Sequence, residues 1–373
     1  MSATCDQAAE LVTQQLGFDC HDVSPVASVR SPFDLAHWTM PLLELLIIAG
    51  AIFALVHAIR RYKDGDPINL ALWFAPLVYL MVTEPPLYFP EWFGLDEVYG
   101  FIFAHNQFTV QFMWDRLPLY IIAIYPALFQ LAYEAVRVLG IFRNRGALVG
   151  SIAVAFVSQV FYEIFDQLGP QLGWWAWHDD NQIVNHPALA SVPMNSMLLF
   201  ASVSFGVMTY LVVRFIGPKE DSGQPARGWS LTARIVLIGL VTFPSMAVAG
   251  IPASFFGGDT PNVTGQAWVL GIELGLVWLA GGWILLGAFR GRGTDEVVPM
   301  TSFARIYPVT YVAVMAVFWV AAIPAYFGAT DGITSDGTPI GSGLYVIACF
   351  IAADIILALL YTGRRSRVDV LTG

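Results

Sequence analysis

Two carboxylic acids near the end of an apolar stretch, Glu163 and Asp166, are the best candidates for acid–base chemistry in this sequence. They are three residues apart, and residues at that spacing share one face of a helix. Two carboxyl groups on one face can divide the roles of proton donor and proton acceptor. Alternatively, both acids only form hydrogen bonds to neighbouring helices. The pair therefore predicts a site without naming its reaction.

A run of tryptophans follows the two acids. Trp174, Trp175 and Trp177 come directly before His178. Aromatic faces attract cations, so the run could hold a cationic ligand or stabilise a carbocation. Tryptophan is also enriched where helices leave a membrane, so a plain interfacial belt is the alternative. On the catalytic interpretation, His178 orients the nucleophile for the acid pair.

Further polar residues could complete a pocket. Glu44, Glu84 and Glu273 map to the same half of their apolar segments as Glu163. Ionisable side chains within a bilayer tend to face cavities or partners. We therefore expect an acidic and aromatic pocket near one membrane surface, with residues 162–196 as its lid and one wall. The expected substrate-binding residues are Trp174, Trp175, Trp177, Asn195, His105, Glu84, Glu44 and Glu273.

We predict no cofactor, although a divalent metal remains an alternative. Its ligands would be His178, Asp179 and His105, whose side chains suit Zn, Fe or Mn. No two histidines have the spacing of a helical ligand pair, and no Gly-rich phosphate loop is present. An orienting network of hydrogen bonds is the simpler interpretation of these residues.

The composition indicates a membrane protein. Of the 373 residues, 57% are hydrophobic and only 12% are charged, against about 25% charged in soluble domains. Apolar runs long enough to span a bilayer recur along the chain. We predict an all-α, polytopic bundle of nine helices at residues 39–59, 67–83, 117–140, 147–168, 191–213, 232–255, 266–289, 306–327 and 342–362. They form one domain at residues 36–363, between a tail at 1–35 and a tail at 364–373.

Basic residues set the expected orientation. Sixteen of the 18 Lys and Arg residues fall in one set of alternating loops or at adjacent helix ends, and only Arg30 and Arg116 do not. By the positive-inside rule, the N-terminus is outside and the C-terminus is cytoplasmic. The scarcity of Lys favours a bacterial source, and hence the inner (plasma) membrane. Nucleic acid binding is not expected, and no mid-membrane Lys exists for a retinal Schiff base.

Several local features complete the prediction. Residues 8–16 could form a short surface helix, and residues 101–114 an interfacial or re-entrant helix. Pro85 should end the second membrane helix at Glu84, because proline cannot continue a helix. Cys5 and Cys20 lie in the same exterior tail, where a disulfide could form or not.

Several of these motifs resemble known families. The sequences HNQF (105–108), RLPLYI (116–121), WWAWHD (174–179) and VPMNS (192–196) resemble the motif series of an uncharacterised multi-pass membrane family. A carboxylate-bearing helix followed by Pro170, Trp-x-Trp and Pro-x-Asn is also similar to the membrane carotenoid hydratase family, whose members add water to terminal alkenes of carotenoids. This similarity covers residues 160–200. That family places an Asp directly before the Pro, whereas Asp166 here is four residues ahead.

These patterns leave three functional hypotheses. The first is an intramembrane lyase that performs hydratase- or cyclase-like acid catalysis on an isoprenoid or other lipid alkene. The second is a proton-coupled transporter that uses the acids as a relay. The third is an accessory subunit of a membrane complex. The expected partners are membrane lipids and a hydrophobic small molecule.

Overall fold

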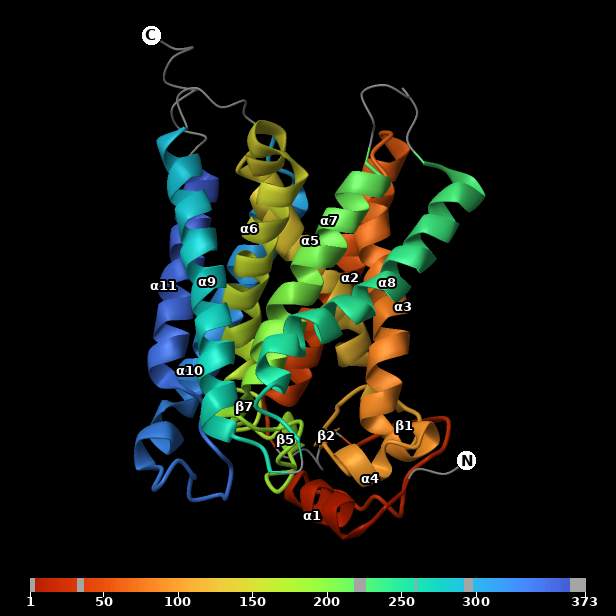
Figure 1. The fold of residues 1–373 in the computed structure, drawn as a ribbon, viewed down its shortest axis with the longest axis vertical. Coiled ribbons are helices and arrows are strands. Elements are labelled where there is room, and N and C mark those ends of the chain that lie inside the picture. The colour runs from red at the N-terminus through yellow and green to blue at the C-terminus, as the bar shows by residue number, and fades with distance from the viewer. Residues whose placement is uncertain (1–3, 32–36, 218–225, 259, 292–297, 363–373) are drawn as a thin grey trace.

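The protein is a bundle of long helices with a small cap at one end (Figure 1). The computed structural model describes residues 4–31, 37–217, 226–258, 260–291 and 298–362. Nine helices in these segments are long and apolar enough to cross a membrane. They are α2 (Met40–Lys63), α3 (Ile68–Tyr88), α5 (Leu119–Val138), α6 (Ile141–Asp166), η2 (Ser196–Val203) continued by α7 (Ser204–Phe215), α8 (Gly228–Ser254), α9 (Val263–Arg290), α10 (Ser302–Gly328) and α11 (Gly343–Thr362). The prediction of an all-α polytopic fold is confirmed at this level.

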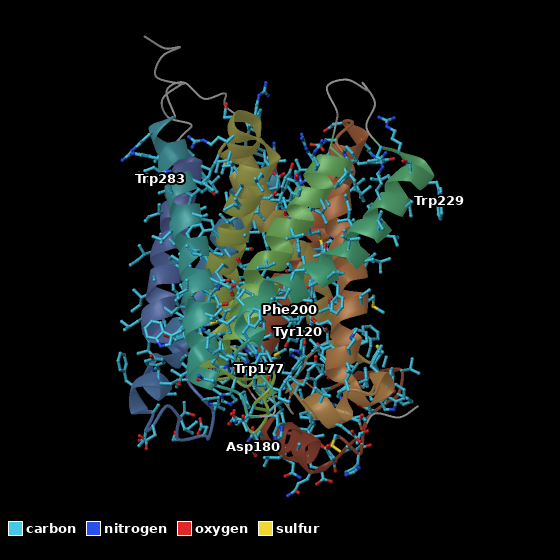
Figure 2. The ribbon with its side chains drawn as sticks, viewed as in Figure 1. Tyr120, Trp177, Asp180, Phe200, Trp229 and Trp283 are labelled. Carbon is cyan, nitrogen blue, oxygen red and sulfur yellow. A yellow bond between two sulfur atoms is a disulfide. The ribbon has the colours of Figure 1, made fainter. Side chains whose placement is uncertain are left out.

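The packing follows from where apolar side chains lie. Helix α5 is the centre of the bundle, with 89% of its most apolar 18-residue window buried. Peripheral helices instead expose large apolar residues, such as Leu279 and Leu344. Such a surface suits lipid, because a helix that is apolar all round must be covered by core or by membrane. Figure 2 shows two exposed tryptophans, Trp229 and Trp283, near the end of the bundle opposite the cap.

We call the end with the cap the capped end. In the described residues it holds the short elements α1 (Gln7–Gln15), η1 (Pro90–Phe93), α4 (Asp96–Tyr99), β1 (Ala27–Val29), β2 (Phe103–His105), β3 (Val110–Phe112), β4 (Leu117–Pro118), β5 (Trp175–Trp177), β6 (Ala188–Leu189) and β7 (Val192–Pro193). The strands form three small antiparallel sheets, β1–β3–β4, β2–β5 and β6–β7.

The predicted helix at residues 101–114 is wrong. This segment contains β2 and β3. Strand β2 pairs with the distant β5, and β3 pairs with the distant β1 and, across a turn, with β4. Met113, Trp114 and Asp115 have φ values of 56°, 55° and 57°, which is the left-handed turn between β3 and β4. Hydrogen bonds to other strands of the cap therefore satisfy the backbone N–H and C=O groups of this segment, in place of the hydrogen bonds within a helix.

The cap is built in two layers over the bundle. In the β2–β5 ribbon, Phe103 pairs with Trp177, Ala104 with Ala176 and His105 with Trp175. Successive side chains of a strand point to opposite faces. The two alanines therefore face away from the other four residues, and they pack against α1.

Helix α1 corresponds to the short helix expected at residues 8–16. Its buried Ala9, Val12 and Leu16 form an apolar cluster with the alanine face of the ribbon. Cys5 and Cys20 form a disulfide that closes the segment around α1. The sequence had left this pairing open.

Helix α3 does not end at Glu84, as predicted. It continues through Pro85 and Pro86 to Tyr88. The backbone N–H of Phe89 donates to the Pro85 carbonyl at 2.9 Å and closes the last turn. Glu84 is therefore buried inside the helix, rather than placed at its mouth.

We call the opposite end of the bundle the basic end. Most described cations lie at helix ends there, namely Arg60, Arg61, Lys63, Arg137, Arg143, Arg145, Arg214, Arg227, Arg234, Arg290 and Arg305. Arg30 and Arg116 lie in the capped end. Lys219, Arg292 and the predicted tail at 364–373 lie outside the described residues.

Candidate functional site

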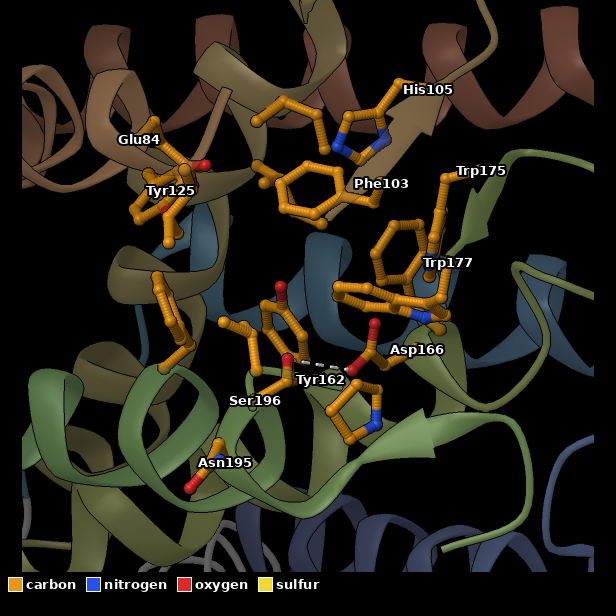
Figure 3. A pocket seen from close by; sticks show the side chains of 17 residues that line it. Glu84, Phe103, His105, Tyr125, Tyr162, Asp166, Trp175, Trp177, Asn195 and Ser196 are labelled. Carbon is orange, nitrogen blue, oxygen red and sulfur yellow. Dashed lines mark hydrogen bonds between the residues drawn. The ribbon is translucent and has the colours of Figure 1, made fainter. Parts of the chain in front are cut away.

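A cavity of about 100 Å³ lies where the bundle meets the cap. Its walls are α3, α5, α6, η2 and the β2–β5 ribbon (Figure 3). The polar residues that line it are Glu84, His105, Tyr125, Tyr162, Asp166, Asn195 and Ser196. Its aromatic lining also includes Phe103, Phe165, Trp175, Trp177 and Phe200. None of the described lining residues is Lys or Arg.

The two carboxyl groups of the cavity lie on different walls. Glu84 of α3 accepts a hydrogen bond from the Tyr125 hydroxyl. Asp166, the last residue of α6, accepts one from Ser196 Oγ at 3.3 Å. Figure 3 shows the Glu84–Tyr125 pair separated from Asp166 and Ser196 by the aromatic side chains. Each acid is thus oriented by a hydroxyl group, which leaves further carboxyl lone pairs for a ligand.

The third polar group is a neutral histidine. His105 lies in β2, and its Nδ1 is 3.0 Å from the Tyr120 hydroxyl. Burial lowers the pKa of His105 to about 3, because the charged imidazolium would lose its hydration. The ring is therefore uncharged near neutral pH. It can orient a water molecule or accept a proton, but it does not supply a standing positive charge.

The ribbon supplies the aromatic wall. The rings of Phe103 and Trp177 meet edge to face with centroids 5.1 Å apart. Trp175 packs against Phe165 at 4.9 Å and lies directly over Gly169. A Cβ at position 169 would be 1.9 Å from the Trp175 ring. The glycine is therefore what allows this indole to reach its place in the wall.

The structure brings six of the predicted site residues to one cavity: Glu84, His105, Asp166, Trp175, Trp177 and Asn195. Strand pairing explains why His105 lies beside Trp175 and Trp177, which are 70 and 72 residues later in the chain. Although Glu163 and Asp166 are three residues apart on α6, they do not both line the cavity. Asp166 lines the cavity, whereas Glu163 does not and instead accepts a hydrogen bond from Gln167 Nε2 at 3.0 Å.

The other predicted site residues lie elsewhere. Glu44 accepts hydrogen bonds from the backbone N–H groups of Phe108 and Thr109, so it anchors the segment between β2 and β3. Trp174 is fully buried, and its Nε1 donates to Thr39 Oγ1 at 3.0 Å. These contacts join the cap to the bundle.

His178 and Glu273 also lie outside the cavity lining. His178 Nδ1 is 3.2 Å from the Phe101 carbonyl oxygen. Glu273 is partly exposed on α9. Of the three residues predicted as catalytic, Asp166 alone lines the described cavity.

The structure does not bring the proposed metal ligands together. In the described part of the chain, one group of His, Cys, Asp or Glu places its ligand atoms within 4.8 Å of each other: Cys5, Asp19, Cys20 and His21. The two sulfur atoms of that group are joined in the disulfide. His178, Asp179 and His105 do not form such a group.

Sequence reasoning missed several residues of the cavity. Ser196 ends the VPMNS motif and Tyr125 lies in the predicted span 117–140, but nothing in the sequence joins them to Asp166 and Glu84. Phe103 could have been found by its two-residue spacing from His105, had the segment been interpreted as a strand. The start of the fifth membrane helix is the π-helix η2, which places Ser196 and Phe200 in the lining. π-Helices are rare and occur often at functional sites.

A buried acid at the basic end was also missed. Glu134 falls within the predicted span 117–140, and its spacing from Arg137 was the available signal. Arg137 donates to both Glu134 oxygens, at 2.7 and 2.8 Å. Asn69 and Thr301 donate at 3.0 and 2.8 Å, and His57 Nε2 is 3.3 Å away. This ion-paired cluster ties α2, α3 and α5 to the start of α10.

Comparison with known proteins found no matching family model, no matching curated protein and no matching solved structure.

Proposed function

We propose that this integral membrane protein is an enzyme that adds water to an alkene of an isoprenoid or other lipid by acid catalysis. One observation carries the proposal. Two buried carboxyl groups, Glu84 and Asp166, lie on different walls of an aromatic cavity that also holds the neutral His105. Positioned proton donors and acceptors in a water-poor site are what this chemistry requires.

Asp166 is the acid in this mechanism. Its carboxyl proton forms a C–H bond with the electrons of the alkene, which leaves a carbocation on the neighbouring carbon. The aromatic faces of Trp177 and Phe103 stabilise that cation. A water molecule held by His105 then attacks it, and Glu84 accepts the released proton. Return of this proton to Asp166 completes the cycle, so alkene and water give an alcohol.

The cavity faces the exterior in this proposal. Arg and Lys residues gather at the basic end, and basic residues favour the cytoplasmic side. The Cys5–Cys20 disulfide of the capped end suits an oxidising exterior compartment. The protein would thus lie in a plasma membrane with its cavity in the outer leaflet.

The basic-end cluster does not favour the transporter hypothesis. A proton relay needs acids that can gain and lose protons at several depths. Glu134 adds an acid at a second depth, but Arg137 holds it through both oxygens. A carboxylate paired in this way stabilises the fold and is not suited to gain and lose protons.

Water addition can be tested with the purified protein in lipid nanodiscs. Acyclic carotenoids and shorter polyprenyl alkenes are incubated with it in H2¹⁸O and analysed by mass spectrometry. We expect products that have gained one molecule of labelled water. Asp166→Asn should lower the rate by about 10²–10⁴-fold, the usual contribution of a positioned acid. The matched control is Asp180→Asn, which changes an exposed acid of the cap.

Two results would contradict the proposal. One is the absence of labelled alcohol with every alkene offered to folded protein. The other is equal activity of the Asp166→Asn and Asp180→Asn variants, because the cavity acid would then have no special role.

A further inference from the structure

The cavity is too small for a whole isoprenoid. A dry protein cavity of about 150 Å³ is filled by a single benzene molecule. The cavity here is about 100 Å³, so it accommodates only the end of a longer chain, of about one isoprene unit. If the proposed substrate class is correct, the remaining chain must lie outside.

The cavity is not enclosed, and its partly exposed lining residues show which side is open. They include Leu87 of α3, Phe200 of η2, and Trp177 and Val184 at and after β5. The walls formed by α5 and the end of α6 contribute mostly buried residues, such as Ile124, Phe165 and Asp166. The opening is therefore bounded by α3, η2 and the loop that follows β5.

Helix α8 crosses this side of the bundle (Figure 1), but none of its described residues lines the cavity. Its middle packs against α3, where Gly239 meets Ala75 and Val78, and it crosses diagonally in front of α7 toward η2 and α9 (Figure 1). Met246 contacts Tyr79 of α3, whereas the later residues Val248 and Ile251 are 65% and 49% exposed. Leu87 is two turns beyond Tyr79 along α3. Leu87 and Phe200, both partly exposed, therefore flank the open side of the cavity.

We propose that a long apolar chain enters the cavity end-first from the membrane, through the seam between α3 and η2. Leu87 and Phe200 form the two sides of this portal. The terminal unit reaches Trp175 and Trp177, and the rest of the chain lies along the membrane-facing surface of α3 and η2. This inference rests on the proposed function for the chemical class of the chain, but it concerns binding and not turnover.

End-first binding has a direct consequence for specificity. The protein should tolerate large changes in chain length, because the excess chain remains in lipid. It should reject added bulk on the terminal unit, because the walls around that unit are buried aromatic rings.

Photolabelling in lipid nanodiscs tests the portal. Two probes are used, both C20 geranylgeranyl chains, one with a diazirine at the terminal unit and the other with a diazirine beside the hydroxyl head. After illumination, labelled peptides are mapped by mass spectrometry. The terminal probe should label Trp175 and Trp177 at least tenfold more than the head-side probe does. The head-side probe should label the outer surface of α3 and η2.

Narrowing the portal should remove labelling of the cavity. Phe200→Trp and, independently, Leu87→Trp should each lower labelling of Trp175 by the terminal probe at least tenfold. Leu279→Trp is the matched control, because Leu279 is 73% exposed on α9, away from the lining. Thermal unfolding is measured for every variant, and two portal variants allow for one that fails to fold.

The outcomes separate this inference from the proposed function. Equal cavity labelling by both probes, no cavity labelling, or normal labelling in both folded portal variants would overturn the portal. Asp166→Asn should lose water addition but still accept the terminal probe. Position-dependent labelling without any water addition would support the portal and refute the enzyme.

Discussion

Replacing Gly169 by alanine should displace Trp175 from the cavity wall. The alanine Cβ would be 1.9 Å from the Trp175 ring, and an ordinary carbon contact begins at about 3.4 Å. The ring must therefore move by about 1.5 Å. It has little room, because it is 2% exposed and packs against Phe165 with ring centroids 4.9 Å apart.

The expected energetic cost follows from this crowding. Overpacking a filled core costs about 1–3 kcal/mol. Gly282→Ala is the matched control, since a Cβ there meets no atom within 4 Å. Alanine in an exposed helix interior is favoured over glycine by about 0.5–1 kcal/mol. The two substitutions are chemically identical, but crowding opposes one and helix propensity favours the other, so their effects on stability should differ in sign.

Thermal unfolding in nanodiscs, together with labelling by the terminal diazirine probe, measures both consequences. Gly169→Ala should unfold at a lower temperature than the wild type and lose labelling of Trp175, while Gly282→Ala should retain at least the wild-type stability and the wild-type labelling. The reasoning is refuted if the two variants unfold at the same temperature and label equally, because Trp175 would then not depend on Gly169 for its position.

Three further predictions concern the rest of the molecule. Arg137→Met should lower the free energy of unfolding by about 3–5 kcal/mol, because it leaves the buried Glu134 without its cation. His105 should remain neutral in NMR spectra down to about pH 4, since its folded pKa is about 3 against an ordinary 6.5. The free energy of unfolding should not depend on this ionisation above pH 6.5, and it should fall by about 1.4 kcal/mol per pH unit from pH 6.5 to about pH 3, because only the unfolded chain binds the proton there. Reducing the Cys5–Cys20 disulfide, whose partners are 15 residues apart, should destabilise the cap by about 3 kcal/mol and speed hydrogen exchange in α1.

Each of these has its own control. Arg214→Met removes an exposed cation of the basic end and should change stability little. An imidazole signal that titrates near pH 6.5 would show that His105 is hydrated and not buried. Unchanged hydrogen exchange in α1 after full reduction would mean that apolar packing alone holds the cap.

The sequence alone predicted the membrane helices, and for a clear physical reason. A bilayer requires about 20 apolar residues for each crossing, and that local signal does not depend on tertiary contacts. The helix boundaries were less accurate: the predicted helices at 117–140 and 191–213 begin in strands β4 and β7. Pro85 predicted a helix end that α3 does not have, because its last turn closes through Phe89.

The residue types of the site were also visible in the sequence. Glu84, His105, Asp166 and the tryptophans were recognisable because charged and aromatic side chains are conspicuous in an apolar chain. Which of these residues lie together in the fold was harder to predict. The helical spacing put Glu163 and Asp166 on one face, but packing against other helices left only Asp166 in the cavity lining.

Tertiary structure decided which of these residues meet. Three-residue strands carry too little pattern to be recognised, so the β2–β5 pairing that sets His105 beside Trp175 could not be predicted. The π-helix η2, which brings Ser196 to Asp166, has no sequence signature either. Asp166 and the tryptophans were thus conspicuous from the start. The cavity exists because long-range pairing folds the tryptophans over Asp166 and leaves Glu163 behind the wall.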